Sequence, residues 1–108
     1  MKDQAERAEY DKQRKKIRAK RDISILKQEL GGCCVACLSD EKLQFDHIDP
    51  KTKKFMLGSE AGRISLPKLR VEAEKCQLLC QTCHIIKHRI AGKKGTLVMS
   101  PDVLFTLF

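Results

Sequence analysis

Two Cys-x-x-Cys pairs constrain this chain more than any other feature of its sequence. The pairs are Cys34/Cys37 and Cys80/Cys83, in a chain of 108 residues. A gap of two residues lets both sulfurs of a pair face one tetrahedral ion, and soft thiolate ligands suit zinc. A cage of four protein ligands has no open position, so we predict a structural Zn²⁺ and not a catalytic one.

The other cysteines and the expected cellular setting leave some alternatives open. Cys33 could replace Cys34 as a ligand, although its spacing to Cys37 is less suitable, and Cys76 is predicted to be a buried apolar residue. One pair could instead be a redox dithiol. The sequence shows no signal-peptide pattern and no membrane-spanning run, so we expect a cytoplasmic protein of a bacterium or a phage-infected cell, where cysteines stay reduced.

The first 30 residues predict one long helix. Residues 3–30 contain neither Pro nor Gly, and two glycines at 31–32 end the segment. In its second half, Ile23, Leu26 and Leu30 share one helical face, which predicts contact with a core. The first half is too polar for such contact, so we expect it to project into solvent or to lie along a partner.

The rest of the chain predicts a small α+β fold. Residues 42–49 alternate, with Leu43, Phe45 and His47 on one face, which predicts a strand that ends at Pro50. The other expected elements are a returning strand at 55–57, a loop at 58–65, helices over 67–75 and 82–91, a short strand at 96–99 and a helix that begins at 100–102.

This pattern divides the chain into three parts. Residues 1–31 form a basic helical extension, residues 32–92 form the zinc-bearing domain, and residues 93–108 form a C-terminal tail. The stretch from Val103 to Phe108 is too apolar to be left in water. We therefore expect the tail to pack on the domain or on a second copy in a homodimer.

Three polar residues near the zinc ligands form a candidate catalytic site: Asp46, His47 and His84. Cys83 fixes the position of His84, and His47 shares the strand face on which the final helix is expected to pack, which brings it toward His84. Asp46 points the other way in a regular strand, so it joins the site only where the strand bends or ends. Taken singly, each of the three is more often a structural residue.

An oxygen and nitrogen pair such as Asp46 and His84 can hold a divalent cation with open positions. Hydrolysis of a phosphodiester needs a nucleophilic water, stabilisation of the five-coordinate phosphorus and charge relief on the leaving oxygen, and one metal supplies the last two. A neutral imidazole, here that of His47, can take the proton from water near neutral pH. Together the three residues favour a phosphodiester-cleaving site.

These motifs together resemble the HNH endonuclease family, in a zinc-bearing branch common in phages. The matching elements are Pro50, Lys54–Phe55 and three runs: C-V-A-C from Cys34, F-D-H from Phe45, and K-C-Q-L-L-C-Q-T-C-H-I-I-K from Lys75 to Lys87. They lie within residues 33–89, and their order and spacing together are specific. The resemblance implies a ββα-metal fold with His47 as general base, Asp46 and His84 as ligands of a catalytic Mg²⁺ or Mn²⁺, and the four cysteines as the zinc site.

Two positions depart from the family pattern. Lys75 stands where many members have an Asn that braces the catalytic loop, although a subset of the family resembles this chain there. His88 stands where a Thr is common. Since His88 lies four residues after His84 on the same helix face, it could be an extra ligand, a phosphate contact or a solvated residue.

The charge of the chain predicts a polyanionic partner. It has 22 Lys and Arg against 14 Asp and Glu, a formal net charge of +8 and a pI near 9.3. We expect sequence-tolerant, salt-dependent binding of double-stranded DNA, weakened by deletion of residues 1–21, unless the basic helix is only a solvated coil. The candidate contacts are, beside the site, Lys87, Arg89, Lys93 and Lys94 and, on the N-terminal helix, Arg14, Lys15, Arg18 and Arg21.

Three functions compete at this stage. The first is a metal-dependent DNA endonuclease. The second is a catalytically inactive, zinc-stabilised nucleic-acid-binding module, which would use the same knuckles and the same basic helix. The third is a protein-interaction module that uses the apolar tail. The combination of Asp46, His47 and His84 favours the endonuclease, because neither alternative needs those three residues.

Overall fold

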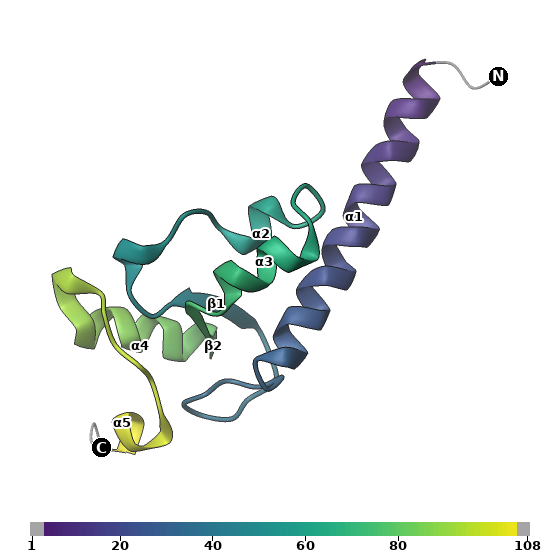
Figure 1. The fold of residues 1–108 in the computed structure, drawn as a ribbon. Helices are drawn as coiled ribbons and strands as arrows, with labels where there is room; N and C mark the ends of the chain where they lie inside the picture. Colours follow the sequence, from purple (N-terminus) through teal and green to yellow (C-terminus); the bar gives the residue numbers. More distant parts are fainter. Residues whose placement is uncertain (1–3, 106–108) are drawn as a thin grey trace.

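The computed structural model describes residues 4–105, apart from the side chain of Lys94, and has the expected α+β architecture with one two-stranded sheet (Figure 1). Cys34, Cys80 and Cys83 lie in one of its two cores, beside the sheet, and Cys37 is exposed next to them. The elements are helix α1 (Gln4–Glu29), strand β1 (Leu43–His47), helices α2 (Leu57–Glu60) and α3 (Leu66–Ala73), strand β2 (Cys76–Cys80), helices α4 (Gln81–Ala91) and α5 (Pro101–Phe105), and short 3₁₀ turns at Pro50–Thr52 and Gly92–Lys94.

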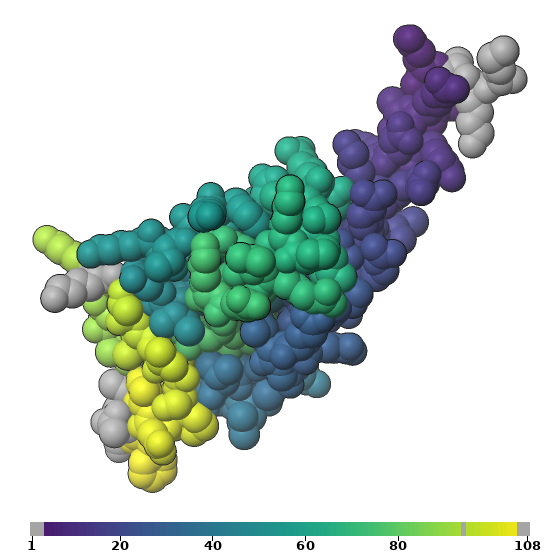
Figure 2. All heavy atoms as spheres, viewed as in Figure 1, coloured from purple at the N-terminus to yellow at the C-terminus, as the bar shows by residue number. Residues whose placement is uncertain are grey.

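Helix α1 is one unbroken element of 26 residues, as its composition predicts. Its second half joins the compact part of the chain, because Leu26 is buried and Ile23 packs beside it. Gly62 lets the turn before α3 approach α1 closely: a Cβ at Gly62 would lie 2.7 Å from the carbonyl oxygen of Lys15. The N-terminal end of α1 projects away from the rest of the molecule (Figures 1 and 2).

The sheet pairs β1 with β2 in antiparallel register, from Leu43 opposite Cys80 to His47 opposite Cys76. The predicted strand at 42–49 is therefore confirmed as β1. Its partner, however, is not the predicted strand at 55–57, which is wrong: that segment leads into α2. The run C-Q-L-L-C is buried at all five positions, as befits a strand covered on both faces, and it forms β2 instead.

The predicted short strand at 96–99 is also wrong, since these residues are in neither strand nor helix. The segment lies beside β1 and β2 but makes irregular contacts. Leu97 donates its backbone N–H to the carbonyl of Ile48, while Met99 donates to the side-chain oxygen of Gln77. The side chain of Gln77 thus accepts the backbone N–H of Met99, which in a regular strand would be bonded to a backbone carbonyl.

Two clusters of buried side chains hold these elements together. The helical core joins α1, α2 and α3 to the sheet and consists of Leu26, Leu57, Ala61, Leu69, Ala73 and Cys76. The cysteine core surrounds the start of α4 and consists of Cys34, Ala36, Leu79, Cys80, Cys83 and Met99. The sheet contributes to both cores: Cys76 belongs to the helical core with Phe45 packed against it, and Leu79 and Cys80 belong to the cysteine core with Leu43 packed against it.

The described part of the C-terminal tail packs on the cysteine core. Helix α5 confirms the predicted helix start, and Val103 and Leu104 pack against the cysteine core. Phe105 is 84% exposed, and residues 106–108, which belong to the expected packing or dimer segment, lie outside the described residues. Within residues 4–105, no helix is long and apolar enough to cross a membrane.

Candidate functional site

The four predicted zinc ligands converge on one point. Their sulfur atoms all lie within 4.8 Å of one another, and the Sγ atoms of Cys37 and Cys80 are 3.5 Å apart. Four thiolates at about 2.3 Å from a tetrahedral zinc would lie about 3.8 Å from each other. The donor set and the spacing of these cysteines therefore fit a structural zinc.

Each knuckle is shaped by its own backbone. Cys80 ends β2 and caps α4, and its sulfur accepts the N–H of Cys83. In the first knuckle the sulfur of Cys34 accepts the N–H of Cys37. Burial alone would raise the pKa of the Cys34 thiol, but nearby backbone N–H groups outweigh burial and lower this pKa to about 7. The thiolate that a metal requires is thus favoured at Cys34. At Cys37 the effect of a backbone hydrogen bond from Ser39 is outweighed by burial and the neighbouring sulfurs, which raise the pKa of that thiol.

The two remaining cysteines lie outside the cluster, as expected. Cys33 is half-buried next to the first knuckle but is not among the four clustered sulfurs. Cys76 belongs to the helical core, where burial raises the pKa of its thiol to about 12. Cys76 therefore behaves as a small apolar residue near neutral pH.

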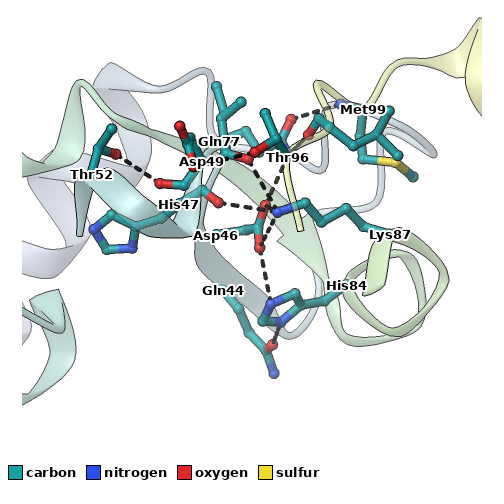
Figure 3. A network of polar contacts seen from close by, with 12 residues as sticks. Gln44, Asp46, His47, Asp49, Thr52, Gln77, His84, Lys87, Thr96 and Met99 are labelled. Carbon is teal, nitrogen blue, oxygen red and sulfur yellow. Dashed lines mark hydrogen bonds and ion pairs between the residues drawn. The ribbon is translucent and has the colours of Figure 1, made fainter. Parts of the chain in front are cut away.

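Asp46 lies in the middle of a polar network between β1 and α4 (Figure 3). Its carboxylate is only 4% exposed. Its Oδ1 atom lies 3.2 Å from Nε2 of His84, and its Oδ2 atom lies 2.9 Å from Nζ of Lys87 and accepts a 2.9 Å hydrogen bond from the amide of Gln77. The Asp46–His84 pair that the family resemblance implies is thus in contact, although strand alternation alone placed Asp46 on the other face.

His47 and Asp46 lie on the opposite faces from those predicted. Asp46 meets α4, whereas Nε2 of His47 lies 2.9 Å from Oε1 of Glu72 on α3. The prediction failed because it assumed that the apolar face of β1 packs under the final helix. Instead, Phe45 on that face packs against the helical core, and His47 goes with it.

Glu72 is buried on α3 and collects three donors. Oε1 accepts hydrogen bonds from His47 and from the backbone N–H of Lys54, and Oε2 accepts one from the ammonium of Lys75. Burial alone would raise the pKa of this carboxyl, but these hydrogen bonds outweigh burial and lower its pKa to about 2. An ionised Glu72 has no proton to give, so Nε2 of His47 must donate, which leaves Nδ1 of the neutral ring free to accept a proton.

Lys75 braces the loop after β1. Its ammonium donates to the carbonyl of Thr52 at 3.0 Å and to Oε2 of Glu72 at 2.9 Å. Lys75 therefore contacts both the loop and the carboxylate that holds His47.

His84 and His88 complete an oxygen and nitrogen cluster with Asp46. One ligand atom from each residue lies within 4.8 Å of the others, and the two imidazole rings have centroids 4.7 Å apart. Nδ1 of His84 is hydrogen-bonded to Oε1 of Gln44, which leaves Nε2 as the ring nitrogen next to Oδ1 of Asp46. Burial lowers the pKa of His84 despite the opposing charge of Asp46.

Lys87 corrects one prediction of a DNA contact. Its side chain has no exposed surface, and its ammonium is held by Asp46 and by the backbone carbonyls of His47 and Ile48 (Figure 3). A buried ammonium cannot reach a phosphate. Lys87 lies one helical turn after the buried Cys83, and this i,i+4 spacing was the signal that sequence reasoning missed.

The other predicted DNA contacts are spread over two surfaces. Arg89 and Lys93 are exposed near the end of α4, and the side chain of Lys94 lies outside what the structure describes. On α1 the four predicted residues are exposed, and three of them line one shallow groove with Ile17: Arg14, Arg18 and Arg21. Arg21 also contacts the buried Asp22 at 3.3 Å.

A cavity of about 360 Å³ opens beside the polar network. It runs along β1 between α1 and the segment 53–58, and both His47 and His84 line it. His47 comes from β1 and His84 from α4, yet both imidazoles line this one cavity. Neither Glu72 nor the cavity was foreseen from the sequence, because both depend on how α1 and α3 pack against β1.

Comparison of the chain with protein-family models, with curated proteins and with solved structures gives no match.

Proposed function

We propose that this protein is a divalent-cation-dependent DNA endonuclease of the HNH type. The observation that carries the proposal is the contact of Asp46 with His84 beside a cavity that His47 also lines. A carboxylate and an imidazole nitrogen can together hold a divalent cation, and the net positive charge of the chain favours binding of DNA; metal-assisted phosphodiester hydrolysis needs both.

Asp46 and His84 would hold the cation, with His88 as the third ligand. One carboxylate oxygen and two imidazole nitrogens suit Mn²⁺ well and Mg²⁺ with additional waters. When bound, the cation would stabilise the charge on the five-coordinate phosphorus and on the leaving oxygen. Lys87 shares the carboxylate of Asp46, so the pair carries no net charge and we expect modest cation affinity.

His47 would act as the general base through Nδ1, since Glu72 holds Nε2–H. Nδ1 accepts a proton from water as the water oxygen forms its bond to phosphorus, and the bond from phosphorus to the leaving sugar oxygen breaks. The leaving oxygen takes a proton from solvent. Glu72 and Lys75 do not touch the substrate in this scheme; they position the imidazole and the loop beside it.

The first prediction is cation-dependent nicking. Supercoiled plasmid incubated with the zinc-loaded protein is expected to become open circular or linear when Mn²⁺ or Mg²⁺ is added, and to stay supercoiled when it is omitted. Gel electrophoresis measures the conversion. Omission is a cleaner control than a chelator, because a chelator would also remove zinc from the cysteines.

The second candidate is the inactive nucleic-acid-binding module, and one observation favours it. The ammonium of Lys87 already neutralises Asp46, at 2.9 Å from Oδ2. If the protein binds plasmid DNA but fails to nick it with Mn²⁺, Mg²⁺, Ca²⁺, Ni²⁺ or Co²⁺, this module replaces the endonuclease as the function.

The third element of the proposal is DNA binding by α1. Arg14, Arg18 and Arg21 line one groove, which makes them a better test than deletion of residues 1–21, because deletion would also remove the contact of Lys15 with the turn at Gly62. Changing all three arginines to alanine is expected to weaken duplex binding. If all three contact phosphates, the slope of log K against log salt becomes less negative by about 0.9 per lost contact.

Fluorescence anisotropy at several salt concentrations measures this slope. Gln13→Ala, on the same exposed half of α1, is the control that changes no charge. An unchanged slope in the triple variant would mean that the basic half of α1 does not bind phosphates.

We further propose that Phe105, exposed at the end of the described tail, marks the surface through which a homodimer would form.

A further inference from the structure

The cavity beside the candidate site has apolar walls. Ile23 of α1, Phe45 of β1 and Leu57 of α2 line it, together with Leu43 and the exposed side chain of Met56. Binding of a sugar–phosphate backbone alone requires charged groups and hydrogen-bond donors. Apolar walls such as these do not serve that purpose. Its volume, about 360 Å³, is near the lower end for ligand pockets and suits a group of nucleotide size.

The mouth of the cavity is positively charged. Lys27 of α1 and Lys53 of the loop after β1 line it, and none of the residues that the structure shows lining it is acidic. Lys53 is exposed and Lys27 is half-buried, so both ammonium groups can reach an anion at the opening. An apolar interior below a cationic rim is complementary to a nucleotide, which has a flat apolar base on a charged phosphate.

We propose that this cavity is a subsite for one unpaired nucleobase, next to the phosphate that His47 and His84 face. The inference rests on the proposed nuclease function and names its substrate class. A base that is paired and stacked in a duplex cannot enter the cavity unless it is flipped out, and that step costs free energy. The cost is smallest for a nucleotide that is already unpaired.

The preferred substrate class is therefore DNA with an unpaired nucleotide at the cut, as in a bulge, a mismatch or a single-stranded end; in a plasmid duplex the nucleotide must first be flipped out, at a cost in free energy. Contacts of the basic half of α1 with phosphates are compatible with this, because they tolerate any sequence and would hold the flanking duplex. An extended peptide along the open edge of β1 is the other occupant that the apolar walls allow, and the experiment separates the two.

Gly58 offers a way to fill the cavity without disturbing the fold. It lines the cavity, and a Cβ added to it would meet no atom within 4 Å. Gly58→Phe is expected to weaken binding of an oligonucleotide with a one-nucleotide bulge by about tenfold or more, as loss of one stacked base would. Gly58→Ala and Ser59→Phe are the matched controls and should bind as the wild type does.

Met56 offers an independent variant based on charge. It is 57% exposed, lines the cavity, and is the N-cap of α2 without a side-chain capping bond. Asp and Asn are both favourable N-caps, so neither Met56→Asp nor Met56→Asn should unfold the protein. Met56→Asp places a carboxylate at the cavity and is expected to weaken bulge binding more than Met56→Asn does.

The measurement is the affinity of the zinc-loaded protein for a short duplex that carries 2-aminopurine at a one-nucleotide bulge. The same duplex without the bulge is the comparison. Neither Mg²⁺ nor Mn²⁺ is added. The chain has no Trp, so 2-aminopurine emission can be followed against a low protein background. Because no cutting is needed, this test succeeds or fails separately from the nicking assay. Equal affinity for the two duplexes, or bulge affinity unchanged in both Gly58→Phe and Met56→Asp, would overturn the inference and leave the peptide as occupant.

Discussion

His47→Ala is expected to lower the rate of plasmid nicking by about 10²- to 10⁴-fold, the usual contribution of a general base. The buried carboxylate of Glu72 accepts from Nε2 of this imidazole, which leaves Nδ1 as the nitrogen that can take a proton. Alanine removes the proton acceptor and leaves Asp46, His84 and His88 to bind the cation.

The fold should survive this change. After loss of the imidazole, the carboxylate of Glu72 keeps the N–H of Lys54 and the ammonium of Lys75, so no buried charge is left without a partner. Circular dichroism and zinc content should therefore match those of the wild type. Such a folded variant that nicks at the wild-type rate would show that another group is the base.

His88→Ala is the matched control for this experiment. It also removes one imidazole, but from the exposed side of α4 and without contact to Glu72. We expect it to raise the Mn²⁺ concentration needed for half-maximal nicking more than it lowers the rate at saturating Mn²⁺. His47→Ala should show the opposite division, with a low rate at every cation concentration.

The second large effect is expected from Cys80→Ser. Cys80 joins the end of β2 to the start of α4, and its sulfur lies 3.5 Å from that of Cys37. Serine is a poor zinc ligand. Structural zinc sites contribute about 10–16 kcal/mol of apparent binding free energy, which is comparable with the whole stability of a small domain, about 5–15 kcal/mol. We therefore expect this variant to lose zinc and to unfold, at least in part.

Zinc content by elemental analysis and thermal unfolding by circular dichroism measure this effect. Cys33→Ser is the matched control, because Cys33 is the neighbouring cysteine outside the cluster, and it should keep both zinc and melting temperature. Wild-type zinc content together with a wild-type melting temperature in Cys80→Ser would exclude the four-cysteine cluster as a structural zinc site.

The zinc ligands could be predicted from sequence because the geometry of a Cys-x-x-Cys knuckle is local. The same holds for α1 and α4, whose ends lie within one or two residues of those predicted. His84 could be placed for a similar reason, since it directly follows Cys83. In each case the neighbouring residues determine the conformation, and no distant contact is needed.

The faces of β1 could not be predicted in the same way. Alternation shows that Asp46 and His47 point to opposite faces, but not which helix covers which face. That depends on α1 and α3, which approach β1 from far along the sequence and bring Ile23 and Glu72 to it. The apolar run from Phe55 to Leu57 predicts a second strand, but the run C-Q-L-L-C is the one that pairs with β1, because strand pairing depends on contacts distant in sequence.

Gln77 gives the carboxyl-terminal segment a direct influence on the site. One amide nitrogen of Gln77 donates to both Asp46 and the carbonyl of Leu97, and its oxygen accepts the N–H of Met99. A single side chain on β2 thus ties the tail to the carboxylate that would bind the cation. A displacement of the tail, for example on assembly of two copies through it, would therefore be transmitted to Asp46, so that the cation affinity proposed for this carboxylate and the assembly would be thermodynamically linked.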